Sequence, residues 1–502
     1  MVDFEKATAT VGVVGAGAMG QGIVQVSLQG GLNVVVHDAR EGGAAAGAEQ
    51  VLKRIDRLVE KGTLKAEDAA AMRGRLTVAR GLDDLKPCDA VIEAVFEDLE
   101  VKRALFQEIE GVVREDCIIA SNTSSLPIAS IARVCRHKGR IAGMHFFNPV
   151  PLMKLVEIIR GPETSDATAQ ALMALGKRQG RVPVLVADSP GFLVNMGGRA
   201  FTTEGLRIQQ ECVATPAQID AIMRDCGHFR MGPFELMDLT GIDVNYPVSM
   251  IVFSEFGYDA RLRTTPQHKL LYEAGRHGRK TKAGHFTYDA DGKATDATGA
   301  DHVTDATPAT ACAVVEGNDR LASLLEEAGI AVGADDGKVA LVAAPMGEDA
   351  TTFAVRTGAD PKRLVAVDVT GDTSRRVTVM TAPGADLSHR DAVAAAIAGT
   401  GRKVTAIKDS PGFVLQRMRA MIANLGCEIA QIGLATPADI DTALQLGLNY
   451  PLGPLQIAED MGARTTLAIM EHLQAITGDD RYRPSLWLRR RALLGLPVHD
   501  AG

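Results

Sequence analysis

The stretch VGVVGAGAMGQGI, residues 11–23, decides the fold of the N-terminal part of this chain. Its first four residues, 11–14, predict a short buried strand, and the apolar spacing after residue 20 predicts a helix. Between them lies the glycine-rich turn Gly15-Ala16-Gly17-Ala18-Met19-Gly20. Glycines at such a position permit a tight turn and let backbone N–H groups and the helix dipole approach a pyrophosphate. The stretch therefore predicts a nucleotide-binding turn.

The alternation of strand and helix continues beyond this turn. Further strands are expected at residues 33–37, 89–96, 117–124 and 140–147, with helical patterns between them. Such alternation indicates a parallel sheet covered by helices. We expect an α/β Rossmann-type domain over residues 1–187.

Asp38 closes the second strand, which follows the helix that begins at the glycine-rich turn. A carboxylate there can accept hydrogen bonds from the adenosine ribose hydroxyls, and it favours NAD over NADP because it repels a 2′-phosphate. Arg40, close behind it in the chain, leaves NADP open. Glycines at such a turn can also serve packing alone, but strand, helix and acid together favour dinucleotide binding.

Composition narrows the class of protein. The 502 residues are enough for several domains, and the net charge of -8 argues against nucleic acid as a partner. The seven cysteines are scattered, with no metal-ligand spacing, so we expect no metal and a reducing, cytoplasmic setting. The sequence shows neither a secretory signal nor an apolar run of membrane-spanning length, and no membrane association is expected.

The second half of the chain repeats motifs of the first. Three pairs of motifs are separated by the same distance along the chain: DSPGF at 188–192 and 409–413, ATPAQID at 214–220 and ATPADID at 435–441, and Gly-Pro at 232–233 and 453–454. A constant offset over so long a segment indicates duplication of a whole domain. Two unrelated helices that both begin with a Pro-Gly cap would explain only the first pair.

Five segments are expected along the chain. After the Rossmann-type domain come an all-α domain at 188–290, a linker at 291–310 without usable periodicity, a reduced Rossmann-like domain at 311–408 and a second all-α domain at 409–502. The fold class is therefore α/β followed by all-α, repeated in degenerate form.

His145 begins the segment HFFNPVP. A histidine on a strand is more often a core residue than a catalyst. However, the prolines force an extended turn, and residues 154–159 predict the next strand, which can bring Glu157 back beside the imidazole. A carboxylate held against an imidazole sets its tautomer and stabilises the imidazolium, as a general base requires.

Five ordered motifs carry a family resemblance: GAGAMGQGI, SNTSSLPI, HFFNPVPLMKLVEII, DSPGFLVN and GRKTKAGHF. Together, over about residues 8–290, they resemble the L-3-hydroxyacyl-CoA dehydrogenase family. In its length the chain is similar to the longer members of the family, which resemble 3-hydroxybutyryl-CoA and 3-hydroxyadipyl-CoA dehydrogenases.

The resemblance implies roles for particular residues. His145 would be the general base, Glu157 would orient it, and Asn195 and Ser124 would bind the 3-oxygen and the adjoining thioester. Arg54 and Lys61 would help to hold CoA, although a solvated helix face explains these two almost as well. The implied NAD-binding residues are Gly15, Gly17, Ala18, Met19, Gly20, Asp38, Glu97, Lys102 and Asn122.

The constant offset between the repeated motifs also gives the residue of the second half that corresponds to each predicted site residue. It places Ala366 at the position of His145, Thr378 at that of Glu157, Pro345 at that of Ser124 and Gln416 at that of Asn195. The turn of C312AVVEGND319 has Glu316 and Asn318 in place of the first two glycines. We expect the second half to have lost both the chemistry and the nucleotide site.

The resulting hypothesis is an NAD-dependent oxidoreductase that converts (S)-3-hydroxyacyl-CoA to 3-oxoacyl-CoA in fatty-acid or phenylacetate degradation. The alternatives are a non-catalytic NAD- or acyl-CoA-binding protein and a dehydrogenase of free 3-hydroxy acids. The expected partner is the acyl-CoA substrate. Residues 409–502 are expected to pack against residues 188–290, within one chain or across a homodimer.

Overall fold

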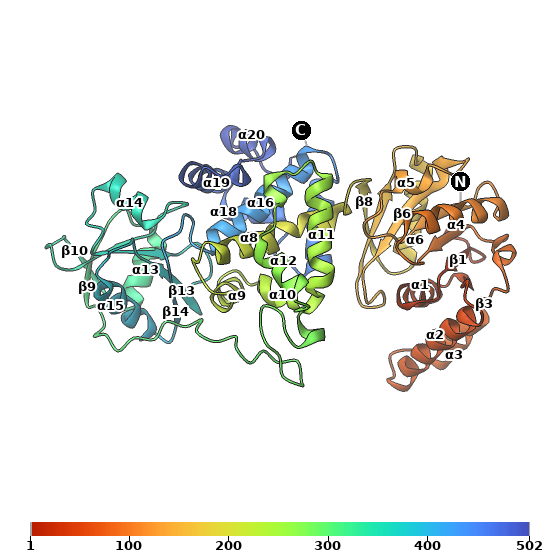
Figure 1. Ribbon diagram of the computed structural model, residues 1–502, viewed down its shortest axis with the longest axis horizontal. Helices are drawn as coiled ribbons and strands as arrows, with labels where there is room; N and C mark the ends of the chain where they lie inside the picture. Colours follow the sequence, from red (N-terminus) through yellow and green to blue (C-terminus); the bar gives the residue numbers. More distant parts are fainter. Residues whose placement is uncertain (1–2, 501–502) are drawn as a thin grey trace. The chain divides into compact units, whose positions relative to one another are not determined.

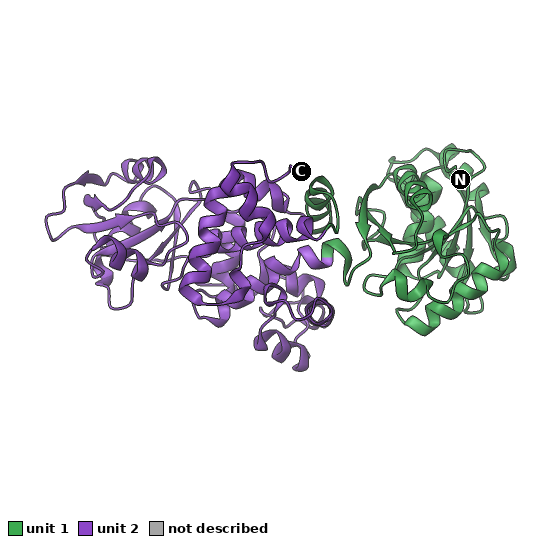
Figure 2. Ribbon diagram, turned by 90° about the horizontal axis from the view of Figure 1, so that it is seen from above, with its two compact units in different colours: residues 1–194, 433–448 green, residues 195–432, 449–502 purple. Residues whose placement is uncertain are grey.

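The computed structural model describes residues 3–500, which form two compact units (Figures 1 and 2). The first unit comprises the chain up to Val194 together with residues 433–448. The second comprises residues 195–432 and the chain from Asn449 onward. A segment of the second half therefore belongs to the unit built by the N-terminal part. Over the described residues, no helix has the length and apolar character needed to cross a membrane.

An eight-stranded sheet forms the centre of the first unit, in the order β3-β2-β1-β4-β5-β6-β7-β8. Neighbouring strands run parallel except β6 and β7, which are antiparallel, so the sheet is mixed where the alternation predicted a parallel one. The strands are β1 (Thr10–Val14), β2 (Asn33–His37), β3 (Leu76–Val78), β4 (Ala90–Glu93), β5 (Ile118–Ser121), β6 (Ile141–Phe146), β7 (Leu155–Arg160) and β8 (Val182–Ala187).

Helices cover this sheet, and the central strands are accordingly buried throughout: every residue of β4 and of β5 is buried. Strands buried on both faces are near-continuous apolar runs, as observed here. The helices of this unit are α1 (Ala18–Gln29), α2 (Gly43–Glu60), α3 (Ala66–Gly74), α4 (Leu99–Val112), α5 (Ile128–Ala132), α6 (Asp166–Arg178) and α17 (Pro437–Leu448), with 3₁₀ turns η1 (Leu82–Leu85) and η2 (Lys138–Arg140).

The second unit contains a six-stranded sheet in the order β10-β9-β11-β12-β13-β14. Again one neighbouring pair, β12 and β13, is antiparallel. The strands are β9 (Ala311–Val314), β10 (Ala331–Gly333), β11 (Ala340–Ala343), β12 (Leu364–Asp368), β13 (Arg376–Met380) and β14 (Lys403–Ile407), covered by α13 (Asp319–Glu327), α14 (Ala350–Thr357) and α15 (Leu387–Ala398).

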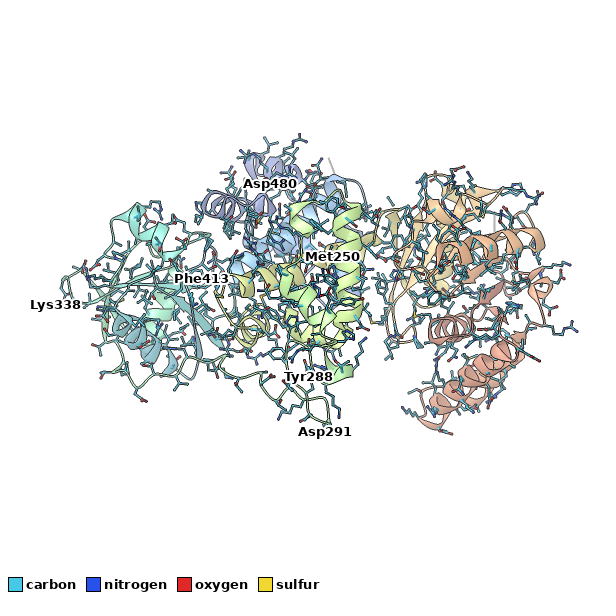
Figure 3. All side chains as sticks on the ribbon, in the orientation of Figure 1. Met250, Tyr288, Asp291, Lys338, Phe413 and Asp480 are labelled. Carbon is cyan, nitrogen blue, oxygen red and sulfur yellow. The ribbon has the colours of Figure 1, made fainter. Side chains whose placement is uncertain are left out.

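The remaining helices come after the first sheet or after the second sheet in the sequence. Their bounds are α7 (Phe192–Gly197), α8 (Arg199–Gln210), α9 (Pro216–Asp225), α10 (Pro233–Thr240), α11 (Ile242–Glu255), α12 (Pro266–Glu273), α16 (Leu415–Gln431), α18 (Pro454–Met461), α19 (Ala463–Thr477) and α20 (Leu486–Leu494), with 3₁₀ turns η3 (Ala260–Leu262), η4 (Arg279–Thr281) and η5 (Asp480–Tyr482). Asp291, labelled in Figure 3, stands near the start of the extended segment that leads to β9.

Helix α16 is central to the helical part of the second unit. It packs against α8 from the first half and against α18, α19 and α20 from the second. Nearly every residue of α16 is buried. Part of residues 409–502, α16, thus packs against α8 of residues 188–290 within one chain, whereas α17 belongs to the first unit.

A buried charge cluster crosses this contact. Glu204 of α8 is inaccessible to solvent, and its two carboxylate oxygens accept from Arg417 at 2.6 Å and Arg481 at 2.7 Å. The Tyr482 hydroxyl also donates to Glu204, at 2.9 Å. Burial alone raises the pKa of Glu204, but the two guanidinium groups outweigh it and the net pKa is below its usual value. The carboxylate is therefore ionised in the folded chain.

We predict that Glu204→Gln destabilises the second unit by about 3–5 kcal/mol, because it leaves two buried guanidinium groups short of their counter-charge. Urea unfolding followed by circular dichroism measures the effect. Glu471→Ala is the control, since Glu471 pairs with Arg489 in an exposed contact whose loss is expected to cost about 0–1 kcal/mol. Equal shifts for the two variants would contradict the prediction.

Candidate active site and cofactor site

His145 and Glu157 face each other across the antiparallel pair β6 and β7, where they are register partners. The His145 Nδ1 atom lies 2.6 Å from Glu157 Oε2. Both residues are buried, His145 with 6% of its surface exposed and Glu157 with none. The predicted contact is confirmed. Because an ionised carboxylate only accepts, Nδ1 carries the proton of the neutral ring and Nε2 is left as the basic atom.

The other oxygen of Glu157 is bound by the backbone that enters α7. Glu157 Oε1 accepts from the amide of Leu193 at 3.1 Å and from that of Val194 at 2.9 Å. The carboxylate thus has three donors and no exposure to water. Three hydrogen bonds offset the cost of burying the charge and determine the direction in which Oε2 points.

Two aromatic rings flank the imidazole. The ring centroid of His145 is 4.5 Å from that of Phe147 and 5.9 Å from that of Phe192. Phe192 has a φ of 53°, in the left-handed region that non-glycine residues rarely adopt. This backbone conformation occurs where the chain turns to present the two amides to Glu157. Apolar rings around one edge of a histidine exclude water and restrict its rotation.

The glycines of the turn have different roles. Gly15 and Gly20 are needed for the fold, whereas Gly17 leaves open space. Gly15 has a φ of 104°, and a Cβ there would lie 2.5 Å from the Ala94 carbonyl oxygen. A Cβ at Gly20 would lie 1.7 Å from the Gly15 carbonyl oxygen. At Gly17, by contrast, an added Cβ would meet no atom within 4 Å.

Gly17 is also the N-cap of α1, and no side chain caps that helix. Ala18 is exposed and Met19 is half-buried. The first turn of α1 therefore offers amide donors, a positive dipole end and open space directly above Gly17. These features fit the pyrophosphate of a dinucleotide.

Asp38 occupies the predicted place at the end of β2, but it is already hydrogen-bonded. Its Oδ2 accepts from the Ala16 amide at 2.8 Å, and Arg40 binds the carboxylate through its backbone and guanidinium groups. The hydrogen bonds from Arg40 hold the pKa of Asp38 well below its usual value. The Arg40 side chain is 73% exposed, so ribose hydroxyls can replace it at little cost.

Lys102 and Glu97 lie in a network at the ends of β4 and β5. The Lys102 ammonium, 1% exposed, lies 2.6 Å from Glu93 Oε1 and 3.2 Å from Glu97 Oε2. Thr123 and the backbone amide of Ser124 both donate to Glu97. Lys102 is thus enclosed by carboxylates, and Glu97 is the member of the network that is partly exposed.

The remaining predicted residues lie on or next to β5, α2 and α7. Asn122 follows β5, and its side-chain oxygen accepts from the Phe146 amide at 2.9 Å, which connects it to the residue next to His145. Asn195 lies in α7, directly after Val194, and is the first residue of the second unit. Arg54 of α2 donates to Gln21 of α1 at 2.8 Å, whereas Lys61, just beyond α2, is exposed.

Sequence reasoning missed Glu93 and the two amides of α7. Glu93 closes β4 as an acid in an apolar run, and a charge that ends a buried strand is the signal that could have identified it. The amides of Leu193 and Val194 carry no side-chain signal.

The second half lacks the nucleotide turn. The chain passes from β9 to α13 through Glu316, whose carboxylate is bound by Arg356, and the Asn318 side chain caps the Leu321 amide. A carboxylate and a filled cap replace the open amides found above Gly17.

One correspondence derived from the constant offset is wrong. The register of the first sheet pairs His145 with Glu157, whereas the register of the second sheet pairs Asp368 with Thr378. The connection between the two strands is shorter in the second sheet, so Asp368, and not Ala366, stands where His145 would. Asp368 is buried and its pKa is raised by burial. Neither position carries a histidine.

Comparison with protein-family models places this geometry in a known group. Residues 10–189 match the model described as 3-hydroxyacyl-CoA dehydrogenase, NAD binding domain. Residues 191–288 and again 412–498 match that of the C-terminal domain. The chain belongs to the 3-hydroxyacyl-CoA dehydrogenase family. It is an NAD-dependent oxidoreductase that acts on 3-hydroxyacyl-CoA.

Relatives of two lengths match the chain. A 3-hydroxyadipyl-CoA dehydrogenase of Escherichia coli is 35% identical over 97% of this chain and 98% of its own length. A probable 3-hydroxybutyryl-CoA dehydrogenase of Deinococcus radiodurans is 38% identical over 55% of this chain and 99% of its own. The crystal structure of a 3-hydroxybutyryl-CoA dehydrogenase from Escherichia coli covers 97% of this chain and 98% of its own, with 34% identity and a TM-score of 0.85.

We predict that Gly17→Ala weakens NADH binding by about tenfold or more, which corresponds to about 1.4 kcal/mol, while stability changes little. The added methyl group enters the open space at the start of α1 without a clash, and the φ of -73° suits alanine. Fluorescence titration with NADH and thermal unfolding measure the two effects. Gly20→Ala is the matched comparison and should destabilise the fold, because its Cβ collides with the Gly15 carbonyl. Normal NADH affinity of a folded Gly17→Ala variant would refute the assignment.

Proposed function

We propose that His145 is the general base of the reaction and that Glu157 positions it. The single observation that carries this proposal is the buried contact of 2.6 Å between His145 Nδ1 and Glu157 Oε2. The Nδ1 proton is engaged, so Nε2 is the atom that takes the proton from the 3-hydroxyl group of the substrate. In the reverse direction the same atom, protonated, is the acid.

Glu157 stabilises the imidazolium that forms when His145 accepts the proton. Its second oxygen is held by the amides of Leu193 and Val194, so the carboxylate does not reorient during the reaction. A counter-charge arranged in advance, in a site closed to water, stabilises the developing charge without reorganisation. Asn195 and Ser124 are proposed to bind the 3-oxygen and the thioester region.

NAD, when bound, accepts the hydride that leaves carbon 3 of the substrate. We propose that the amides above Gly17, with Ala18 and Met19, bind its pyrophosphate and that Asp38 binds its adenosine ribose after Arg40 turns away. Glu97, Lys102 and Asn122 are proposed to line the nicotinamide side. In this network Lys102 acts through Glu97, because its ammonium is buried between carboxylates.

Arg54 and Lys61 are proposed to contact CoA. We further propose that the enzyme is cytoplasmic and that its second half arose by duplication. The double match to one C-terminal family model supports the duplication. So does the left-handed backbone at Phe413, which follows Phe192 at the same offset as the repeated motifs.

The acyl group is proposed to be the six-carbon dicarboxylic adipyl chain. The relative named for that substrate matches 97% of this chain, whereas the relatives named for 3-hydroxybutyryl-CoA that match at 36–38% identity cover 55% of it. The second candidate is the butyryl chain, because the full-length crystal structure from Escherichia coli carries the name of a 3-hydroxybutyryl-CoA dehydrogenase.

We predict that His145→Ala lowers turnover by about 10²–10⁴-fold, the usual contribution of a general base. NADH affinity should not change, because the nucleotide turn is untouched. Glu157→Gln should lower turnover to a smaller extent, because it keeps the shape but loses the charge. His137→Ala, at an exposed histidine of the same unit, is the control and should retain full turnover. Stopped-flow turnover close to normal in His145→Ala would exclude the role.

We predict faster NADH oxidation with 3-oxoadipyl-CoA than with 3-oxobutyryl-CoA at equal concentration. The measurement is the initial rate for both substrates, side by side, with kcat and KM separated. A preference for the butyryl compound would transfer the assignment to the short neutral chain. Turnover of neither would exclude both chains and indicate an acyl group of another length.

A further inference from the structure

Helix α17 comes from the second half of the chain but covers the edge of the first sheet. β8 is the outermost strand there, and α17 contacts both β8 and β7. The Ala187 amide donates to the Leu434 carbonyl at 2.8 Å, and the Leu185 amide is bound by the Asp439 carboxylate. Edge strands need such cover because their free amides otherwise invite pairing with other chains.

The far end of α17 reaches the residues that hold Glu157. A Cβ built on Gly447, the penultimate residue of the helix, would lie 3.1 Å from a methyl carbon of Leu155 and 3.1 Å from one of Val194. Leu155 begins β7, the strand that carries Glu157, and the Val194 amide donates to Glu157. A Cβ at position 447 would be closer to both side chains than an ordinary van der Waals contact, so Leu155 and Val194 would have to shift by a few tenths of an ångström to admit it.

The same contacts recur in the second unit with the halves exchanged. The Lys408 amide donates to the Val213 carbonyl at 3.0 Å, and the Gln218 side chain donates to the Ala406 carbonyl at 3.1 Å. The offset of the repeated motifs relates these residues to Ala187, Leu434, Asp439 and Leu185, respectively. Each half therefore supplies a helix that packs on the sheet of the other half, and this exchange of helices occurs in both units. In the first unit, α17 ends against the residues that hold Glu157.

We propose that Gly447 is a positioning residue for the reaction. Helix α17 holds Val194 against β7, Val194 and Leu193 hold Glu157, and Glu157 holds His145. The inference rests on the proposed roles of His145 and Glu157. It gives the second half, which lacks the histidine and the nucleotide turn, a direct part in the geometry of the active site.

The test compares Gly447→Ala and Gly447→Val with Gly111→Ala and Gly111→Val. Gly111 is the matched control, because it too is the penultimate residue of a helix, α4, and a Cβ there meets nothing within 4 Å. We expect Gly447→Val to lower kcat at least about tenfold, with little change in KM or NADH affinity. Gly447→Ala should lower kcat less, and the Gly111 variants should keep normal kinetics. Circular dichroism verifies folding, and if Gly447→Val does not fold, Gly447→Ala carries the comparison.

A double-mutant cycle with Glu157→Gln separates positioning from general damage. If Gly447 acts through Glu157, the Gly447 substitution should cause little further loss of kcat once Glu157 is glutamine. Additive losses, or Gly447 variants that match the Gly111 variants, would overturn the proposal. Full turnover of the single Glu157→Gln variant would instead refute the proposed role of Glu157, so the two failures are distinguishable.

Discussion

The proposed active site depends on the buried carboxylate of Glu157. One of its oxygens faces His145 across the antiparallel strands β6 and β7, and the other accepts the amides of Leu193 and Val194. An ionised carboxylate without exposure to water costs several kcal/mol unless donors replace the lost hydration. All three donors must therefore be in place, which requires the antiparallel strand pair, the turn that carries Phe192 in a left-handed conformation and the start of α7.

The sheet of the second unit also contains an antiparallel pair, but Asp368 and Thr378 face each other there. Glu316 and Asn318 occupy the turn after β9, where the corresponding turn of the first unit leaves amides open. The packing contacts persist. Glu204, Arg417 and Arg481 join helices of both halves, and α9 and α17 each cover the sheet of the other half. The second half therefore has the surfaces that support the first half and lacks the groups proposed to perform the chemistry.

Local signals in the sequence were sufficient for much of the fold and of the site. The glycine spacing of residues 15–20 predicted the strand–turn–helix unit, because only glycine fits the φ of Gly15 and the contact at Gly20. The His145–Glu157 pair was predictable because prolines between two apolar runs bring the second run back beside the first. The offset misplaced the counterpart of His145, because a shorter connection between strands shifts register without changing the motifs on either side. Lys102 was expected beside the cofactor, but its burial between Glu93 and Glu97 depends on how α4 lies against the end of β4, which the spacing of these residues does not reveal.

The sequence by itself therefore determined the cofactor turn, the histidine, its carboxylate and the repeated motifs, since each depends on residues close together in the chain or on similar motifs at a constant distance. Only the tertiary structure decided which groups hold Glu157 and which half covers each sheet. Backbone amides such as those of Leu193 and Val194 are identical in every residue, so their role depends on where the chain places them. The association of α17 with the first sheet joins Leu434 to Ala187 across almost half the chain, and such a contact is decided by the total burial of both halves.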